Sequence, residues 1–380
     1  MSKQRLTISL SNLLIIIGIG LLLALLWQIR SLLIILMVSI VMAATIAPIV
    51  NAAERLRLPR WLAVITVYLI LIAIVTGGGI LIGPAVIDQI QLLAFNTPIY
   101  LENLQALAEN WVVKFYDGRP ELITQLVDTQ ALTTWVFRSS QEIFLRSVDI
   151  TKGIVGGVLS FILALLISGY MVADSTNLIK GLVQLFPSPW EERLAAQVIP
   201  MRDRMGGYIQ GRVAVAAILG IAVSFGLSIL GLSDFALGLG AIAGVTDLIP
   251  FFGPILGAIP ALIVALSQGG WTFLWVLLLF IIVQNLETYL LDPILVGSSV
   301  KIHPLYQLLA VLGGTQVLGI IGALIVPPWV AGVSVLVDNL YLQPKLMAKQ
   351  PPKTLSTQED AINTESPLNT LSVNSSTLKS

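Results

Sequence analysis

The sequence predicts an all-α polytopic membrane protein of about eight membrane segments. Of its 380 residues, 56% are hydrophobic and only 11% are charged, and the mean hydropathy is +0.90. Two stretches, 235–266 and 305–337, are nearly uncharged and interrupted by Gly and Pro. As an unbroken helix, each would measure roughly 48 Å against a hydrocarbon core of about 30 Å. We therefore expect each to break or to form a re-entrant hairpin inside the membrane.

Ordinary membrane spans are predicted from charge-free runs that are long enough to cross a bilayer. These are residues 6–29, 31–53, 61–87, 153–173 and 213–233. Residues 271–291 form a further span between the two interrupted stretches. The first run follows Lys3 and Arg5, but its length and the lack of a small-residue cleavage site predict an uncleaved helix.

The order of these runs predicts five regions. They are transmembrane helices 1–3 (1–83), an extracytoplasmic amphipathic helical region (84–152), a fourth transmembrane helix with a cytoplasmic connection (153–212), a transport core (213–343) and a disordered tail (344–380). The amphipathic region is either a solvated helical pair or a lid over a pore. The tail is rich in Ser, Thr, Asn, Gln and Lys, which predicts disorder.

The distribution of basic residues predicts cytoplasmic N- and C-termini. Counting through five spans from an inside N-terminus places all the short basic connections on one side. They contain Lys3, Arg5, Arg55, Arg57, Arg60, Lys180, Arg193, Arg202, Arg204, Arg212, Lys345, Lys349 and Lys353. The formal net charge of zero gives no general attraction to nucleic acid, and the absence of cysteine excludes disulfides and thiolate chemistry.

The two interrupted stretches are weakly similar to each other at an offset of 69 residues. Four identities and one polar pair align: Ala241 with Ala310, Gly244 with Gly313, Thr246 with Thr315, Gly253 with Gly322, and Asp247 with Gln316. Because the preceding spans cross in opposite directions, this is the arrangement of an inverted-topology repeat. Both stretches are either hairpins or broken complete crossings.

Asp247 and Glu287 are the candidate intramembrane ionisable residues, and such residues are costly unless paired or hydrated. Gln284 lies one helical turn from Glu287, so a Gln/Glu stripe is expected to offer oxygens to a cation or hydroxylated solute. Thr246 and Asn285 complete the polar group. The alternatives are that Glu287 reaches interfacial water and that Asp247 caps the following half-helix.

Pro250, Gly253 and Pro254 predict an unwound turn, because proline lacks an N–H donor and glycine permits close approach. Freed backbone groups there would bind a solute or ion. The alternative is a kinked, tightly packed helix pair, helped by Gly240/Gly244 and Gly253/Gly257 at four-residue spacing.

His303 is the only histidine, and it precedes Pro304 at the start of the second interrupted stretch. It is a candidate pH sensor, or a residue that starts a helix. Without cysteine, a second histidine or clustered carboxylates, no metal site is predicted. No phosphate-binding loop, Gly-x-Ser-x-Gly elbow or His-Glu-x-x-His motif occurs, so we expect neither enzymatic activity nor a cofactor.

A family resemblance rests on two motifs. The first is Ile249-Pro250 followed by Gly253-Pro254 and by Gly257-Ala258-Ile259-Pro260-Ala261. The second is Gln284-Asn285-Leu286-Glu287, then Asp292-Pro293 and His303-Pro304. Both resemble signatures of the autoinducer-2 exporter family of PerM-like permeases. The chain departs from the family pattern at Asp247, where Asn is common, and at Asp292 before Pro293. An added carboxylate would shift preference toward a cation.

The resemblance implies a bacterial inner-membrane transporter of eight membrane segments that exports the furanone signal autoinducer-2 in quorum sensing. Some relatives are described as Na⁺ or Li⁺/H⁺ antiporters, and members assemble as homopentamers. The expected passenger is a small polar solute or a monovalent cation. A passive oligomeric channel and a scaffold without transport are the alternatives, but the paired broken segments favour a secondary transporter.

Overall fold

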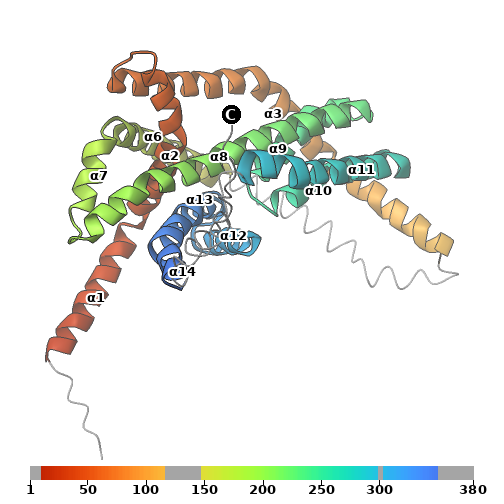
Figure 1. Ribbon diagram of the computed structural model, residues 1–380. Coiled ribbons are helices and arrows are strands. Elements are labelled where there is room, and N and C mark those ends of the chain that lie inside the picture. The colour runs from red at the N-terminus through yellow and green to blue at the C-terminus, as the bar shows by residue number, and fades with distance from the viewer. Residues whose placement is uncertain (1–9, 116–146, 298–302, 350–380) are drawn as a thin grey trace, which may run out of the picture. The chain divides into compact units, whose positions relative to one another are not determined.

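Helices make up all of the secondary structure in the part of the chain that the computed structural model describes, residues 10–115, 147–297 and 303–349 (Figure 1). This confirms the predicted all-α class. The predicted amphipathic run between 122 and 143, and the tail from residue 350, lie outside the described residues. The chain divides into two compact units, Met1–Val335 and Leu336–Ser380.

Except across residues 116–146 and 298–302, which are not described, the helices follow one another along the chain with short connections. In the first half they are α1 (Leu10–Gln28), α2 (Arg30–Glu54), α3 (Arg60–Phe115), α6 (Ser147–Ala173), α7 (Ser175–Val183) and α8 (Trp190–Ile229). In the second half they are α9 (Ser233–Asp247), α10 (Gly253–Gln268), α11 (Gly270–Leu286), the π-helix η1 (Glu287–Gly297), α12 (Pro304–Leu318), α13 (Ile320–Val337), η2 (Asp338–Leu342) and α14 (Gln343–Lys349).

Five described helical segments are long and apolar enough to cross a membrane, or six if one bent pair is counted as a span. The five are Arg30–Glu54, Arg60–Leu93, Trp190–Ile229, Gly270–Gly297 and Ile320–Leu346. The predicted count of eight is not confirmed. One reason is that Ile29 alone joins α1 to α2, and its N–H donates to the Leu25 carbonyl (3.0 Å) as it would inside a continuous helix.

Two helices continue through boundaries that hydropathy suggested. α3 runs without interruption from the third predicted span into residues 84–115, and α8 runs from 190 through 212 to 229. Hydropathy marks where a chain becomes apolar, whereas a helix ends only where its backbone hydrogen bonds end. The amphipathic region therefore begins inside α3, and the cytoplasmic connection ends inside α8.

The first interrupted stretch breaks as predicted. α9 ends at Asp247, and five residues of turn follow before α10 begins at Gly253. Phe251 takes the left-handed conformation, with φ of 68°, which is costly for a residue with a side chain. α10 packs back against α9, because a Cβ on Gly257 would lie 2.7 Å from the Ala243 Cα. The stretch is a helical hairpin.

The second interrupted stretch breaks at a single residue, Gly319, which has φ of 65°. Across this break, the backbones of Gly314 and Gly322 are in direct contact. The repeat offset of 69 residues places Gly319 opposite Pro250, inside the first break. Both breaks therefore fall at equivalent positions of the predicted repeat.

The main apolar core lies among α8, α9, α10 and α11. Its fully buried members include Leu227, Leu239, Val264 and Val276. Glycines let α8 and α9 approach closely, since Gly240 and Gly244 both lie against the backbone of Gly220. The tight packing that four-residue glycine spacing predicts is therefore present.

Replacing Gly244 with alanine is expected to destabilise the protein by about 1–2 kcal/mol, because overpacking typically costs about 1–3 kcal/mol and the gain in helix propensity offsets part of it. The new Cβ would lie 2.8 Å from the Ala216 carbonyl oxygen. Gly313→Ala is the matched control, since it stands at the equivalent repeat position with nothing within 4 Å. Thermal unfolding in detergent should show a lower melting temperature for Gly244→Ala and no decrease for Gly313→Ala.

Candidate functional site

Arg212 lies at the centre of a buried charged cluster. It is only 4% exposed, in the middle of α8. One of its terminal nitrogens lies 3.2 Å from Asp247 Oδ1, and the other lies 2.9 Å from Glu287 Oε1 and 3.4 Å from Asp292 Oδ1. A single guanidinium thus joins α8 to the end of α9 and to the π-helix η1. We call these four residues the Arg212 cluster.

Local backbone features bring the cluster together. Gly211 lies against the backbone of Leu295 and Val296 in η1, and a Cβ at this position would collide with the Leu295 carbonyl. The small residue next to Arg212 therefore lets η1 approach closely enough for its carboxylates to reach the guanidinium. Asp247 is the last residue of α9, and it pairs with the second terminal nitrogen of Arg212.

η1 is an 11-residue π-helix that continues α11 and begins at Glu287. π-Helical turns are rare and frequently occur at functional sites. Pro293, inside η1, cannot donate a backbone hydrogen bond. The wider turn changes the direction of side chains after Leu286, so Glu287 and Asp292 both reach the same arginine.

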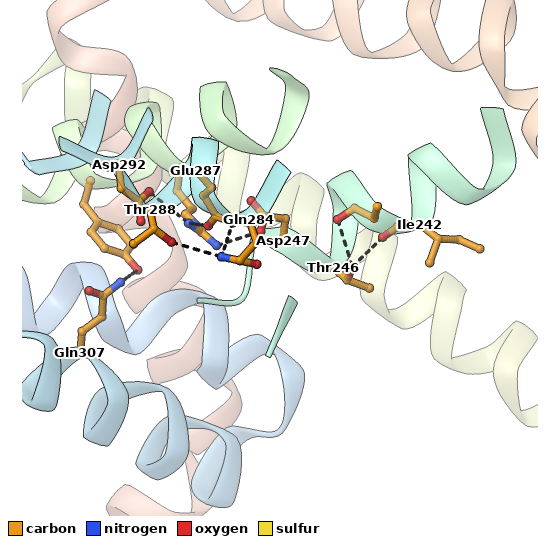
Figure 2. A network of polar contacts seen from close by, with 11 residues as sticks. Ile242, Thr246, Asp247, Gln284, Glu287, Thr288, Asp292 and Gln307 are labelled. Atoms are coloured by element: carbon orange, nitrogen blue, oxygen red, sulfur yellow. Dashed lines mark hydrogen bonds and ion pairs between the residues drawn. The ribbon is translucent and has the colours of Figure 1, made fainter. Parts of the chain in front are cut away.

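Gln284 extends the cluster along α11 (Figure 2). Its Nε2 donates to Glu287 Oε2 (3.1 Å) and to Thr288 Oγ1 (3.4 Å). The predicted Gln/Glu stripe is therefore present, with Glu287 only 4% exposed. The alternative, in which Glu287 reaches water at a helix end, is wrong.

The cluster holds three carboxylates against one guanidinium, and two of its polar atoms have no partner. Among the described protein atoms, Arg212 Nε and Asp247 Oδ2 are buried without a hydrogen bond. A cavity of about 20 Å³, room for about one water molecule, is lined by Asp247, Gln284 and Glu287 together with apolar side chains. An uncompensated buried carboxylate attracts a proton, a cation or a hydrogen-bond donor.

Comparison with known proteins identifies the family. Residues 13–342 match the AI-2E family transporter profile. The chain belongs to the AI-2E transporter family. Relatives of this AI-2E family member include "Putative transport protein YrrI" of Bacillus subtilis, which is 29% identical over 81% of this chain and 86% of its own length. "Putative transport protein YueF" of the same organism is 28% identical over 79% and 81%.

A third relative comes from a different organism. "Putative transport protein MT0215" of Mycobacterium tuberculosis is 26% identical over 81% of this chain and 83% of its own length. All three names describe transport proteins. With its long apolar helices, this AI-2E family member is a multi-pass membrane protein.

Three predicted polar residues lie outside the Arg212 cluster of this AI-2E transporter. The Thr246 hydroxyl donates to the Ile242 carbonyl of its own helix (2.7 Å), as Figure 2 shows. Asn285 is exposed and donates to the Ile281 carbonyl (2.7 Å). Gln316 is exposed on α12. Adjacency in sequence to Asp247 and Glu287 therefore does not place these side chains in the cluster.

The proline and glycine residues of the first break mainly shape the turn and its packing. Pro250 is buried in the turn, and Gly253 packs on the backbone of Thr246 and Asp247. Pro254 lines the small cavity. The N-cap of α10 is Phe252 and shows no side-chain cap hydrogen bond, so the alternative role of Asp247 as its cap is wrong.

His303 caps α12. Its Nδ1 accepts a hydrogen bond from the Leu305 N–H (3.2 Å), and the side chain is exposed. Replacement by alanine is expected to cost about 0.5–1 kcal/mol of stability, whereas asparagine, a good N-cap residue, should preserve it. Unfolding of both variants in detergent checks the cap. A shifted pH profile of transport in the stable His303→Asn protein would instead favour the predicted sensing role.

Sequence reasoning missed Arg212 and Tyr208 as parts of the site, and it noted Asp292 only as an added carboxylate that would shift preference toward a cation. The sequence places Arg212 in a predicted cytoplasmic connection with no partner, whereas in the structure it is buried in the middle of α8 and pairs with three carboxylates. The signal was present: a charge-free run follows Arg212 directly, and two buried acids need a cation. Tyr208, only 2% exposed, lies one turn earlier on α8 and accepts a hydrogen bond from Gln307 Nε2 (3.3 Å).

Proposed function

We propose that this protein is a secondary transporter that moves a small polar solute across the membrane, and that the Arg212 cluster binds the solute or its coupling ion. The observation that supports this most is one buried guanidinium shared by carboxylates from α9 and η1. Buried ionisable groups in membrane proteins mark substrate or ion pathways by default.

The position of the cluster supports coupling between binding and movement. Asp247 is the last residue of α9, immediately before the break, and Glu287 is the first residue of η1. A proton, cation or solute hydroxyl that competes for either carboxylate would weaken its bond to Arg212. Because these bonds join three helical elements, occupancy would alter how the elements pack.

Autoinducer-2 is the proposed solute, since it is the passenger that the family resemblance implies and its hydroxyl groups suit carboxylate acceptors. A bacterial inner-membrane location with cytoplasmic termini, and a homo-oligomeric assembly, belong to the same proposal. The excess of acidic groups favours a second candidate, Na⁺(Li⁺)/H⁺ antiport, because carboxylates that outnumber their arginine suit a monovalent cation or a proton.

Flux in reconstituted vesicles tests the proposal. Autoinducer-2, Na⁺ and Li⁺ would be compared under an imposed proton gradient, with protein-free vesicles as the control. Gradient-dependent movement of autoinducer-2 alone supports the exporter, and cation-dependent proton flux supports the antiporter. Flux that always follows the solute gradient, without coupling, would indicate a passive channel, and no flux of any passenger would contradict the proposal.

A further inference from the structure

The elbow between α6 and α7 points to a surface that the proposed function does not use. The two helices meet at Asp174 with a bend of 84°. α6 has 27 residues, about 40 Å, which is long enough to cross a bilayer. α7 has nine residues, about 14 Å, which is too short. A helix at nearly a right angle to a crossing helix lies parallel to the membrane surface.

Hydrogen bonds from the start of α3 fix this elbow. Arg60 Nε donates to the Val172 carbonyl at the end of α6 (3.0 Å), and its Nη2 donates to Ser175 Oγ at the start of α7 (2.8 Å). Asn177 Nδ2 also donates to Asp174 Oδ1 (2.7 Å). The orientation of α7 relative to α6 is therefore held by Arg60 of α3, which bonds to both helices, and by Asn177 of α7.

α7 presents a water face opposite an exposed apolar face. Leu178 and Leu182 are 39% and 64% exposed, whereas Val183 is buried against the protein. At about 100° per residue, these leucines lie about 40° apart, and Lys180 lies about 200° from Leu178. Both Lys180 and Gln184, on the polar side, are exposed. One face thus contacts protein, one suits water, and one is apolar with no cover from the described residues.

The apolar surface continues on both sides of α7. Before it, Leu166 and Tyr170 of α6 are 67% and 63% exposed, as expected for side chains that face lipid. After it, Leu185, Phe186 and Trp190 are 78%, 46% and 47% exposed. Tryptophan and tyrosine are enriched where hydrocarbon meets headgroups. We propose that residues 175–190 form an interfacial anchor, whose leucine face inserts into the bilayer surface at the end of α6.

Apolar burial rather than charge should drive the contact. Nearby charges are mixed, with Lys180 and Arg193 against Asp174, Glu191 and Glu192. Amphipathic helices bind membranes through buried apolar area together with attraction to anionic lipid. With little net charge, insertion is expected to be the same with or without anionic lipid.

Single-cysteine spin labelling tests the anchor in the full-length protein, which contains no cysteine of its own. Leu182→Cys probes the apolar face, Leu185→Cys provides an independent second position, and Gln184→Cys is the matched control on the polar face. Labelled proteins would be reconstituted into phosphatidylcholine vesicles with and without phosphatidylglycerol. Relaxation by oxygen, which partitions into lipid, is compared with relaxation by a water-soluble nickel complex.

The expected result is several-fold greater relaxation by oxygen than by nickel at 182 and 185, and the reverse at 184, in both lipid mixtures. Nickel access at 182 and 185 equal to that at 184 would overturn the anchor, because the leucine face would then be in water. Shielding of 182 and 185 from both reagents would also overturn it, because protein from this chain or another copy would then cover the face. Neither result depends on whether the protein transports anything.

Discussion

Replacing Arg212 with methionine is expected to destabilise the protein by about 3–5 kcal/mol, since removal of one partner leaves buried charges uncompensated. Asp247 and Glu287 are only 3% and 4% exposed, so bulk water does not reach them to compensate for the lost guanidinium. Unfolding of the purified protein in detergent, followed by tryptophan fluorescence as denaturing detergent is added, measures the loss.

Arg202→Met is the matched control, because Arg202 lies on the same helix and pairs with the exposed carboxylate of Asp203. Such a surface pair contributes about 0–1 kcal/mol. Adding Asp247→Asn and Glu287→Gln to Arg212→Met should recover much of the stability, since amides need no counter-charge. The role assigned to the cluster would be contradicted if Arg212→Met were as stable as Arg202→Met. It would also be contradicted if the triple variant were no more stable than Arg212→Met.

Replacing Glu287 with glutamine is expected to lower gradient-coupled flux roughly tenfold or more, because hydrogen bonds to charged groups contribute about 1.5–3 kcal/mol. The amide retains an acceptor for Arg212, and Asp247 and Asp292 still supply negative charge. The protein should therefore assemble as the wild type does. Flux and elution from size-exclusion chromatography would be measured on the same preparation.

Asp234→Asn is the control for this experiment. Asp234 is an exposed carboxylate in the first turn of α9, at the opposite end of that helix from Asp247. Its replacement should leave flux unchanged. If the wild type transports and Glu287→Gln vesicles match it under every gradient, the assignment of Glu287 to the pathway fails, although the transport function stands.

Local properties of the sequence were sufficient to predict the all-helical class and the two breaks. Pro250 removes a backbone donor, and Gly319 adopts a left-handed conformation, so each acts within its own segment. The pairing of Gln284 with Glu287 follows from helical spacing alone. The close contacts of Gly240 and Gly244 also match a pattern that is visible in sequence.

The sequence could indicate that a buried cation was needed, but it could not show which distant residues pair with one another. Arg212 has its carboxylates 35, 75 and 80 residues away, and the charge count of a connection does not distinguish a buried arginine from an exposed one. The π-helical turn at Glu287 depends on how η1 packs against Gly211 of α8. The continuity of α8 through residue 212 likewise reflects tertiary packing rather than hydropathy.

The two breaks occupy equivalent positions in the repeat, but different contacts hold them in place. Residues 248–252 follow Asp247, which is tied to α8 by an ion pair, and Gly253 is wedged against the backbone of α9. Gly319 has nothing within 4 Å of the place where a side chain would start. The glycine contact between Gly314 and Gly322 holds the second hairpin together, but among the described residues no ion pair joins residues at its break. If the repeat alternates between two shapes, opening the first hairpin should therefore require an ion pair to break, whereas opening the second should require only that the two glycines separate.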